Sequence, residues 1–104
     1  MFAAEFETVD GHGRRRREPR ASTMLEAELA IAGAGRAVCR VLDYSTSGAR
    51  LQTYSELERG ALIWLALPGI GRCAATVVWV RNYEAGVEFR KQLSAKAMQT
   101  LTAQ

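Results

Sequence analysis

Period-two alternation of apolar and polar residues, broken at short intervals by glycine-rich turns, constrains the fold of this chain more than any other feature. Within residues 25–31, Leu25, Ala27, Leu29 and Ile31 occupy every second position. A β-strand with one buried face has this period, because successive side chains point to opposite faces. The pattern therefore predicts a half-buried strand over residues 25–31.

The same kind of pattern predicts five further strands, each bounded by glycine or by short polar residues. The connection Pro68-Gly69-Ile70-Gly71 has the length and chemistry of a hairpin turn between the two most apolar runs of the chain. The five further strands are predicted over residues 36–42, 49–52, 61–67, 72–80 and 85–89.

The period changes at the carboxyl end, where Leu93, Ala97 and Leu101 recur at every fourth position. Ser94 belongs to a residue type that favours the N-cap, so we expect a short helix here. Six short strands without helices between them favour an antiparallel barrel, because closure removes exposed strand edges. The predicted fold class is all-β: a six-stranded antiparallel β-barrel with a short C-terminal α-helix that covers one open end.

The length of 104 residues is typical of one compact domain. Residues 1–13 show no sustained periodicity and are expected to form a flexible N-terminal arm, whereas residues 14–104 are expected to form the barrel domain. No apolar run approaches the eighteen or so residues that span a bilayer, and the acidic opening residues resemble no secretion signal. These features predict a cytoplasmic protein without membrane insertion.

Positive charge is concentrated in one short segment. Arg14, Arg15, Arg16, Arg17 and Arg20 fall within seven positions, whereas the whole chain has a formal net charge of +3. Such a local cluster favours a focused contact with an anion over a broad nucleic-acid or membrane surface. Guanidinium groups pair in bidentate fashion with phosphate and with the O6/N7 edge of guanine.

A second polar cluster, Asp43-x-Ser45-x-x-Gly48, separates two of the predicted strands. Short polar side chains bond the local backbone and glycine tolerates positive φ, so a turn is expected here whether or not a ligand binds. A carboxylate can also accept hydrogen bonds from the N–H groups of guanine. Together with the forked side chains of Arg16 and Arg20, this cluster predicts an anionic ligand that carries guanine.

The order of three short segments along the chain is informative: residues 15–20 (RRREPR), 43–48 (DYSTSG) and 86–89 (GVEF). Each is short and degenerate, but their order and spacing within six strands are more specific. Together they resemble a PilZ domain, the bacterial receptor module for cyclic di-GMP. The resemblance covers about residues 14–101.

The resemblance implies that cyclic di-GMP binds on the outer surface of the barrel. The arginines would grip phosphate and guanine edges, the acid and the hydroxyl would bond a guanine, and the glycine would permit close approach. In this family an arginine at the position of Arg15 is associated with two intercalated ligand molecules, so a ligand dimer is favoured. No other cofactor is implied. On ligand binding the arginine arm would change conformation and pass the signal to an unidentified downstream protein. The implied ligand-binding residues are Arg15, Arg16, Arg20, Asp43, Ser45 and Gly48.

Two other functions remain open. A PilZ-like barrel can serve as a protein-interaction adaptor without nucleotide binding, although an adaptor has no need to keep both motifs. A barrel for single-stranded nucleic acid is disfavoured, because aromatic and basic residues do not alternate along one strand, and we expect Trp64 and Trp79 to serve in packing. No catalytic residues are predicted, and Cys39, Cys73 and His12 lack the spacing of metal ligands.

Overall fold

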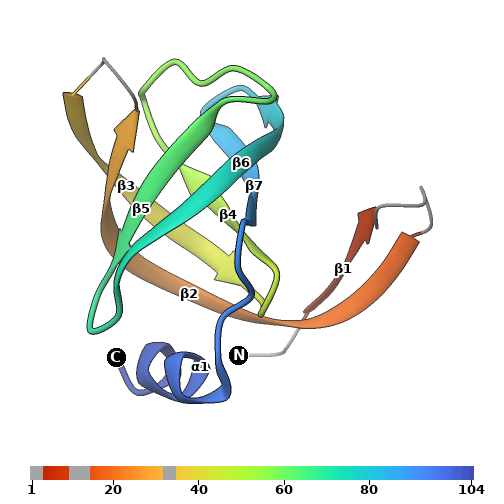
Figure 1. The fold of residues 1–104 in the computed structure, drawn as a ribbon. Helices are drawn as coiled ribbons and strands as arrows, with labels where there is room; N and C mark the ends of the chain where they lie inside the picture. The colour runs from red at the N-terminus through yellow and green to blue at the C-terminus, as the bar shows by residue number, and fades with distance from the viewer. Residues whose placement is uncertain (1–3, 10–14, 32–34) are drawn as a thin grey trace.

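The computed structural model describes residues 4–9, 15–31 and 35–104, which form seven strands and one helix (Figure 1). The elements are β1 (Ala4–Val9), β2 (Arg15–Ile31), β3 (Gly35–Tyr44), β4 (Gly48–Gln52), β5 (Leu62–Leu67), β6 (Gly71–Arg81), β7 (Glu84–Phe89) and α1 (Ala95–Thr102). All six predicted strands are present. The largest difference is at β2, which begins at Arg15 rather than at Leu25.

Six of the strands close into a barrel with antiparallel neighbours. The order around the barrel is β2-β3-β4-β7-β6-β5, and β5 returns to β2, where Leu29 lies opposite Leu65. This closure confirms the predicted six-stranded antiparallel barrel. It also gives the strands hydrogen-bonding partners on both sides, which a small open sheet would lack at its two edges.

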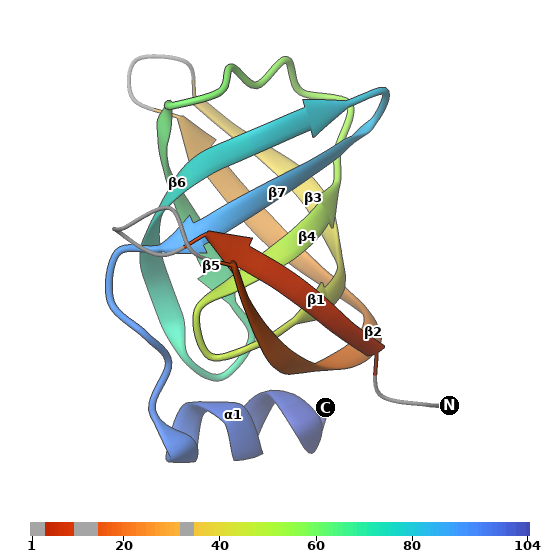
Figure 2. The ribbon, with the colours of Figure 1, turned by 90° about the vertical axis from the view of Figure 1, so that its right-hand side faces the viewer.

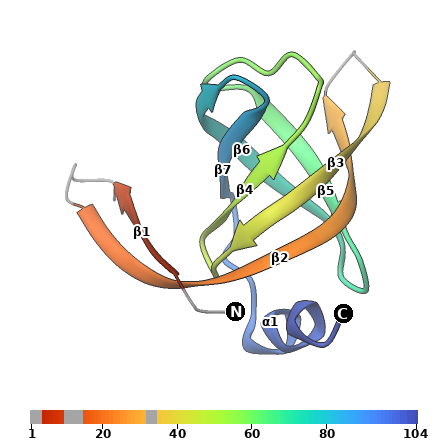
Figure 3. The same ribbon diagram turned by 180° about the vertical axis from the view of Figure 1, so that it is seen from behind.

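The first half of β2 leaves the barrel and forms a hairpin with β1, in which Ala4 lies opposite Arg20. A register shift between Ser22 and Leu25 marks the place where β2 departs, because an irregular pairing of this kind bends a strand. Figures 1 and 3 show the hairpin projecting from one side of the barrel.

Within the segment expected to form a flexible arm, residues 1–13, the structure describes Ala4–Val9 as a strand paired with β2. Acidic residues alternate along this strand, and the register places Glu7 opposite Arg17. Opposite charges at facing positions favour the pairing of two strands. Residues 1–3 and 10–14, which include His12, lie outside the described residues.

The barrel interior is filled by the alternate apolar residues that the sequence pattern predicts. Leu29, Leu51, Ile63 and Leu65 come from three different strands and all have 0% solvent exposure. Each such side chain contributes about 1.5–3 kcal/mol when it is fully buried. The interior is therefore a packed hydrophobic core, and any ligand contact must be made on the outer wall or at an end.

Helix α1 lies below one end of the barrel, as predicted (Figure 2). The Ser94 Oγ accepts a hydrogen bond from the Ala97 N–H at 3.0 Å, which confirms Ser94 as the N-cap. Leu101 is buried against the core, and the hydroxyls of Tyr44 and Thr102 are 3.0 Å apart. The described part of the chain contains no helix long and apolar enough to cross a membrane.

Candidate ligand-binding site

The predicted turn between β3 and β4 is present and tightly bonded. The Ser45 N–H donates to the carbonyl oxygen of Gly48 at 2.8 Å, and the Ser47 N–H donates to the Ser45 Oγ at 3.3 Å. Ser45 is only 1% exposed. The serine of the motif is therefore part of the turn itself, and its hydroxyl already accepts a local bond.

Gly48 has a packing role in the barrel. A Cβ at this position would lie 2.3 Å from the carbonyl oxygen of Val87 on β7, a distance that real side chains do not adopt. Gly48 lies opposite Glu88 in the β4–β7 pairing. The close approach of the two backbones is sufficient to require glycine here, and contact between Gly48 and a ligand stays a prediction.

Asp43 is buried at the end of β3 and is held by an arginine of the next strand. Its Oδ2 lies 2.9 Å from the Nε of Arg50, and the Arg50 Nη1 lies 3.4 Å from the Oε1 of Glu84. Asp43 is 7% exposed, so its carboxylate is largely shielded from water. The ion pair compensates this burial by placing a cation beside the carboxylate.

Arg50 was not among the predicted site residues, although a signal was available. A tight turn over Ser45–Ser47 makes β3 and β4 a hairpin, and such a hairpin brings Asp43 opposite Arg50 in register. Opposite charges at facing positions on the polar side of two strands indicate an ion pair.

The same register continues across the outer wall of the barrel as one row of facing residues. Ser22 of β2 lies opposite Asp43, Asp43 opposite Arg50, Arg50 opposite Gly86 of β7, and Gly86 opposite Trp79 of β6. Five strands thus contribute one residue each to a line that begins near the arginine segment and ends at an indole ring. We call these five residues the cross-strand row.

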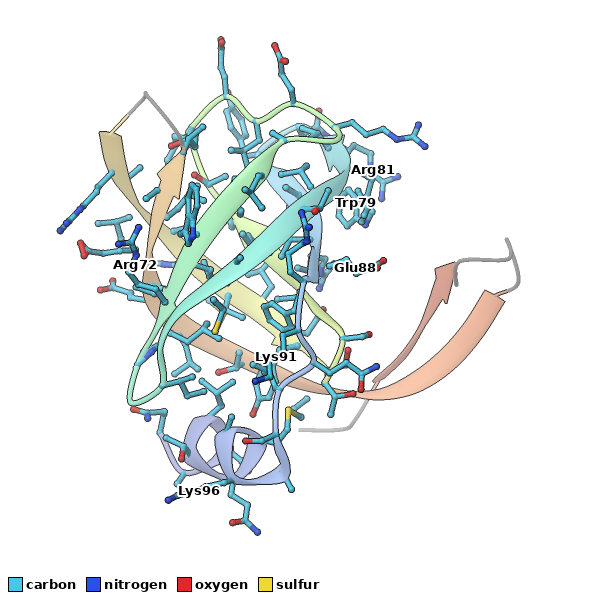
Figure 4. The ribbon with its side chains drawn as sticks, viewed as in Figure 1. Arg72, Trp79, Arg81, Glu88, Lys91 and Lys96 are labelled. Carbon is cyan, nitrogen blue, oxygen red and sulfur yellow. The ribbon has the colours of Figure 1, made fainter. Side chains whose placement is uncertain are left out.

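Trp79 covers the backbone of its neighbour in this row. A Cβ on Gly86 would lie 2.0 Å from the indole Nε1, so the absence of a side chain at Gly86 makes room for the ring. The guanidinium of Arg81 lies 5.9 Å from the ring centroid, within the range of a cation–π contact. Figure 4 shows Trp79 and Arg81 on the side of the barrel toward which the hairpin projects. The indole is partly exposed and presents an aromatic surface beside the ion pair.

The predicted arginines all lie in the part of β2 that pairs with β1. Ala21 of β2 lies opposite Tyr44, the last residue of β3 before the turn. Arg20 is the next residue of β2, just beyond this pair. Arg16 and Arg15 are farther out along the hairpin, opposite Thr8 and Val9. Figure 2, which views the molecule from the side of the hairpin, shows β1 in front of β4 and β7. The arginine strand therefore projects on the side of the barrel that carries the cross-strand row.

Comparison with known proteins agrees with this architecture. A family model described as "PilZ domain" matches residues 14–104. The chain is also similar to the crystal structure of the PilZ domain of CeSA from a cellulose-synthesizing bacterium, with a TM-score of 0.59 and 15% sequence identity over 80% of this chain and 90% of that chain. At this identity the likeness shows the fold alone. No curated protein matches the chain. Because the family model covers almost all of the barrel, its turn and its arginine strand, the chain belongs to the PilZ domain family.

Proposed function

We propose that this PilZ domain is a receptor that binds cyclic di-GMP between the arginine hairpin and the outer wall of the barrel. The observation that carries the proposal is the cross-strand row, in which the ion pair of Asp43 with Arg50 and the indole of Trp79 lie along one line of the outer wall. The hairpin with Arg16 and Arg20 projects on the same side of the barrel. Membership of the PilZ family, the receptor family for this nucleotide, supports the choice of ligand.

Each part of the wall matches one part of the nucleotide. The carboxylate of Asp43 is suited to accept from the N–H donors of a guanine, and Arg50 keeps that carboxylate in one orientation. The indole of Trp79 offers a flat surface on which a guanine can stack, an interaction worth about 1–3 kcal/mol per base. The arginines of the hairpin supply forked donors for the two phosphates and for guanine O6 and N7.

The arginine that precedes the motif supports a proposal for the number of bound nucleotides. Arg15 adds one more forked cation at the outer end of the hairpin, opposite Val9. Two intercalated cyclic di-GMP molecules carry four phosphate charges, and a segment with several arginines is better matched to that charge than to a single dinucleotide. We therefore propose a ligand dimer.

Ligand binding would also change how the hairpin is held. The segment carries several like charges, which repel one another when no anion is bound. Four or five charge-assisted hydrogen bonds at roughly 1.5–3 kcal/mol each exceed the cost of fixing a short segment. The hairpin would then be drawn toward β4 and β7 and would present a changed surface to a downstream protein. The role is binding and signalling rather than catalysis.

Calorimetric titration with cyclic di-GMP tests the proposal. Arg16→Ala and Arg20→Ala should each weaken binding by at least about tenfold, which corresponds to about 1.4 kcal/mol. Arg59→Ala is the matched control, because Arg59 is an exposed arginine in the loop between β4 and β5. The control should bind as tightly as the wild type. Cyclic di-AMP should bind much more weakly, because adenine lacks the O6 acceptor and the N–H donors that Asp43 would contact.

Two results would overturn parts of the proposal. If the folded wild type gives neither heat nor NMR chemical-shift changes with cyclic di-GMP, the domain is not a receptor for this nucleotide and the adaptor function remains. If the nucleotide binds but both arginine variants bind equally well, the ligand is right and the site is wrong.

A further inference from the structure

A second outer face of the barrel, formed by β2, β5 and β6, is mainly apolar. Ile63, Leu65 and Leu67 of β5 are buried in the core, so the residues between them point outward. These outward residues are Leu62, which is 36% exposed, Trp64 and Ala66. Their outward neighbours across the strands are mostly small or apolar and include Ala30, Ala74 and Thr76. We call this surface the Trp64 face.

One row of the Trp64 face carries opposite charges at its two sides. Glu28 of β2 lies opposite Ala66 of β5, and Ala66 lies opposite Arg72 of β6. The acid and the base thus lie on the two strands that flank β5. Each of these strands is about 4.8 Å from β5, measured between backbones. Glu28 and Arg72 are both exposed, and neither forms an ion pair with any residue in the described part of the chain.

The acidic side of this row is hollowed. A depression of about 620 Å³, part of it open to solvent, is lined by Glu26, Glu28, Val38 and Ala66 among others. Val38 is 67% exposed in the described structure, so the hollow combines two carboxylates with an accessible apolar wall. Such a site suits the end of an arginine side chain, whose planar cation binds carboxylates while its methylenes pack on apolar surface.

The basic side presents an arginine of the required kind. The Arg72 guanidinium lies 5.8 Å from the centroid of the Trp64 ring and is held over it by a cation–π contact. Figure 4 shows Arg72 on the side of the barrel away from Trp79, so this surface is separate from the proposed nucleotide site. One face therefore contains both an acidic hollow and an arginine that would fill it in a second molecule.

We propose that the Trp64 face joins two copies of this chain in a symmetric dimer whose two-fold axis runs parallel to β5 and directly above it. A rotation about this axis exchanges β2 and β6, so Glu28 of each copy faces Arg72 of the other, and two equivalent ion pairs form. Trp64 lies close to the axis and meets its own counterpart. In such an isologous interface the same patch must be complementary to itself, and an acid and a base on either side of an apolar strand meet that condition.

The charge pattern favours a second copy over a different partner. A heterologous partner would need to match an acidic hollow, a tryptophan and an arginine in one arrangement, whereas a second copy provides that match by symmetry. Aromatic residues and arginine are also the types that are enriched in interface cores and in binding hot spots. An axis perpendicular to β5 would instead place β2 over β2 and β6 over β6, so Glu28 would have no Arg72 of the other copy opposite it.

Sedimentation equilibrium on the full chain, with and without cyclic di-GMP, tests the dimer through charge reversal. Glu28→Arg and Arg72→Glu should each raise the dimer dissociation constant by at least about tenfold, because each places like charges in both pairs. An equimolar mixture of the two variants should associate again, since both pairs in a mixed dimer have opposite charges. Lys96→Glu on α1 is the control, and it should sediment as the wild type does.

Recovery in the mixture is specific to this interface. It cannot be caused by misfolding of either variant, because a misfolded chain would not regain association when mixed with the other. A wild type that remains monomeric at all accessible concentrations would overturn the proposal. So would a wild-type dimer that tolerates both reversals, or a mixture that associates no better than either variant alone.

Discussion

The barrel carries two tryptophans on opposite sides of its outer wall, and each has an arginine over its ring. The Arg72 guanidinium lies 5.8 Å from the Trp64 centroid, and the Arg81 guanidinium lies 5.9 Å from the Trp79 centroid. The two distances are nearly equal. Their neighbours differ, and the neighbours determine what each surface can bind.

Trp79 belongs to a polar row. It covers Gly86, and beside Gly86 lies the ion pair of Arg50 with Asp43, on the side of the barrel where the arginine hairpin projects. Trp64 lies between Ala30 and Ala74 on an apolar face. A flat ring beside charged, directional groups suits a polar ligand with a π-face, whereas a flat ring among small apolar residues suits another protein surface. The same residue pair is thus suited to different chemistry on the two faces.

The largest effect should come from substitutions at two glycines of the barrel wall, Gly48 and Gly86. Gly48→Ala should lower the free energy of unfolding by about 3 kcal/mol, because the new Cβ meets the Val87 carbonyl oxygen, a backbone atom that cannot turn away. Gly86→Ala should lower it by only about 1 kcal/mol, because its Cβ meets the movable indole of Trp79. Urea denaturation of both variants measures the difference, and equal losses would contradict this view of the two glycines.

Removing the carboxylate of the row should be the next largest effect. Asp43→Ala should weaken cyclic di-GMP binding by about 2 kcal/mol, or roughly thirtyfold, while the dimer constant stays unchanged. Arg50→Ala should weaken binding less, because Arg50 acts by holding Asp43 rather than by touching the nucleotide. Calorimetric titration measures nucleotide binding, and sedimentation equilibrium measures the dimer constant, both on the same preparations. A variant of Asp43 that binds normally would exclude the carboxylate from the site.

The two tryptophans give the most direct comparison of the faces. Trp79→Ala should weaken nucleotide binding by about tenfold, the equivalent of about 1.4 kcal/mol, and leave dimerisation as it is. Trp64→Ala should instead weaken dimerisation and leave nucleotide binding as it is. Thermal melts identify any loss of folding in either variant. If either substitution changes both equilibria equally, the two faces are not independent and the distinction drawn between them fails.

The fold was largely predictable from sequence, whereas the site was predictable only in part. Alternation fixes which residues of a strand face inward, so the six strands, the core and the Ser94 N-cap could all be inferred. The β1–β2 hairpin could not, because the alternation in residues 4–9 is too short to identify a strand, and among its described residues only one pair of opposite charges, Glu7 and Arg17, faces across it. Register was the other obstacle. A shift between Val77 and Trp79 decides that Trp79 lies opposite Gly86, and a sequence pattern does not locate such a shift.

The smallest effect concerns the core that both faces share. Burial raises the pKa of the Cys39 thiol from 9.0 to about 11, because desolvation disfavours the thiolate. The unfolded chain therefore ionises first as the pH rises, so this contribution to stability is complete below pH 9 and is lost between about pH 9 and 11. By pH 9.5 the loss should be about 0.8 kcal/mol. Cys39→Ala should lack this part of the pH dependence, and urea denaturation at a series of pH values compares the two slopes. Parallel slopes would mean that the Cys39 thiol ionises as readily in the folded barrel as in the unfolded chain.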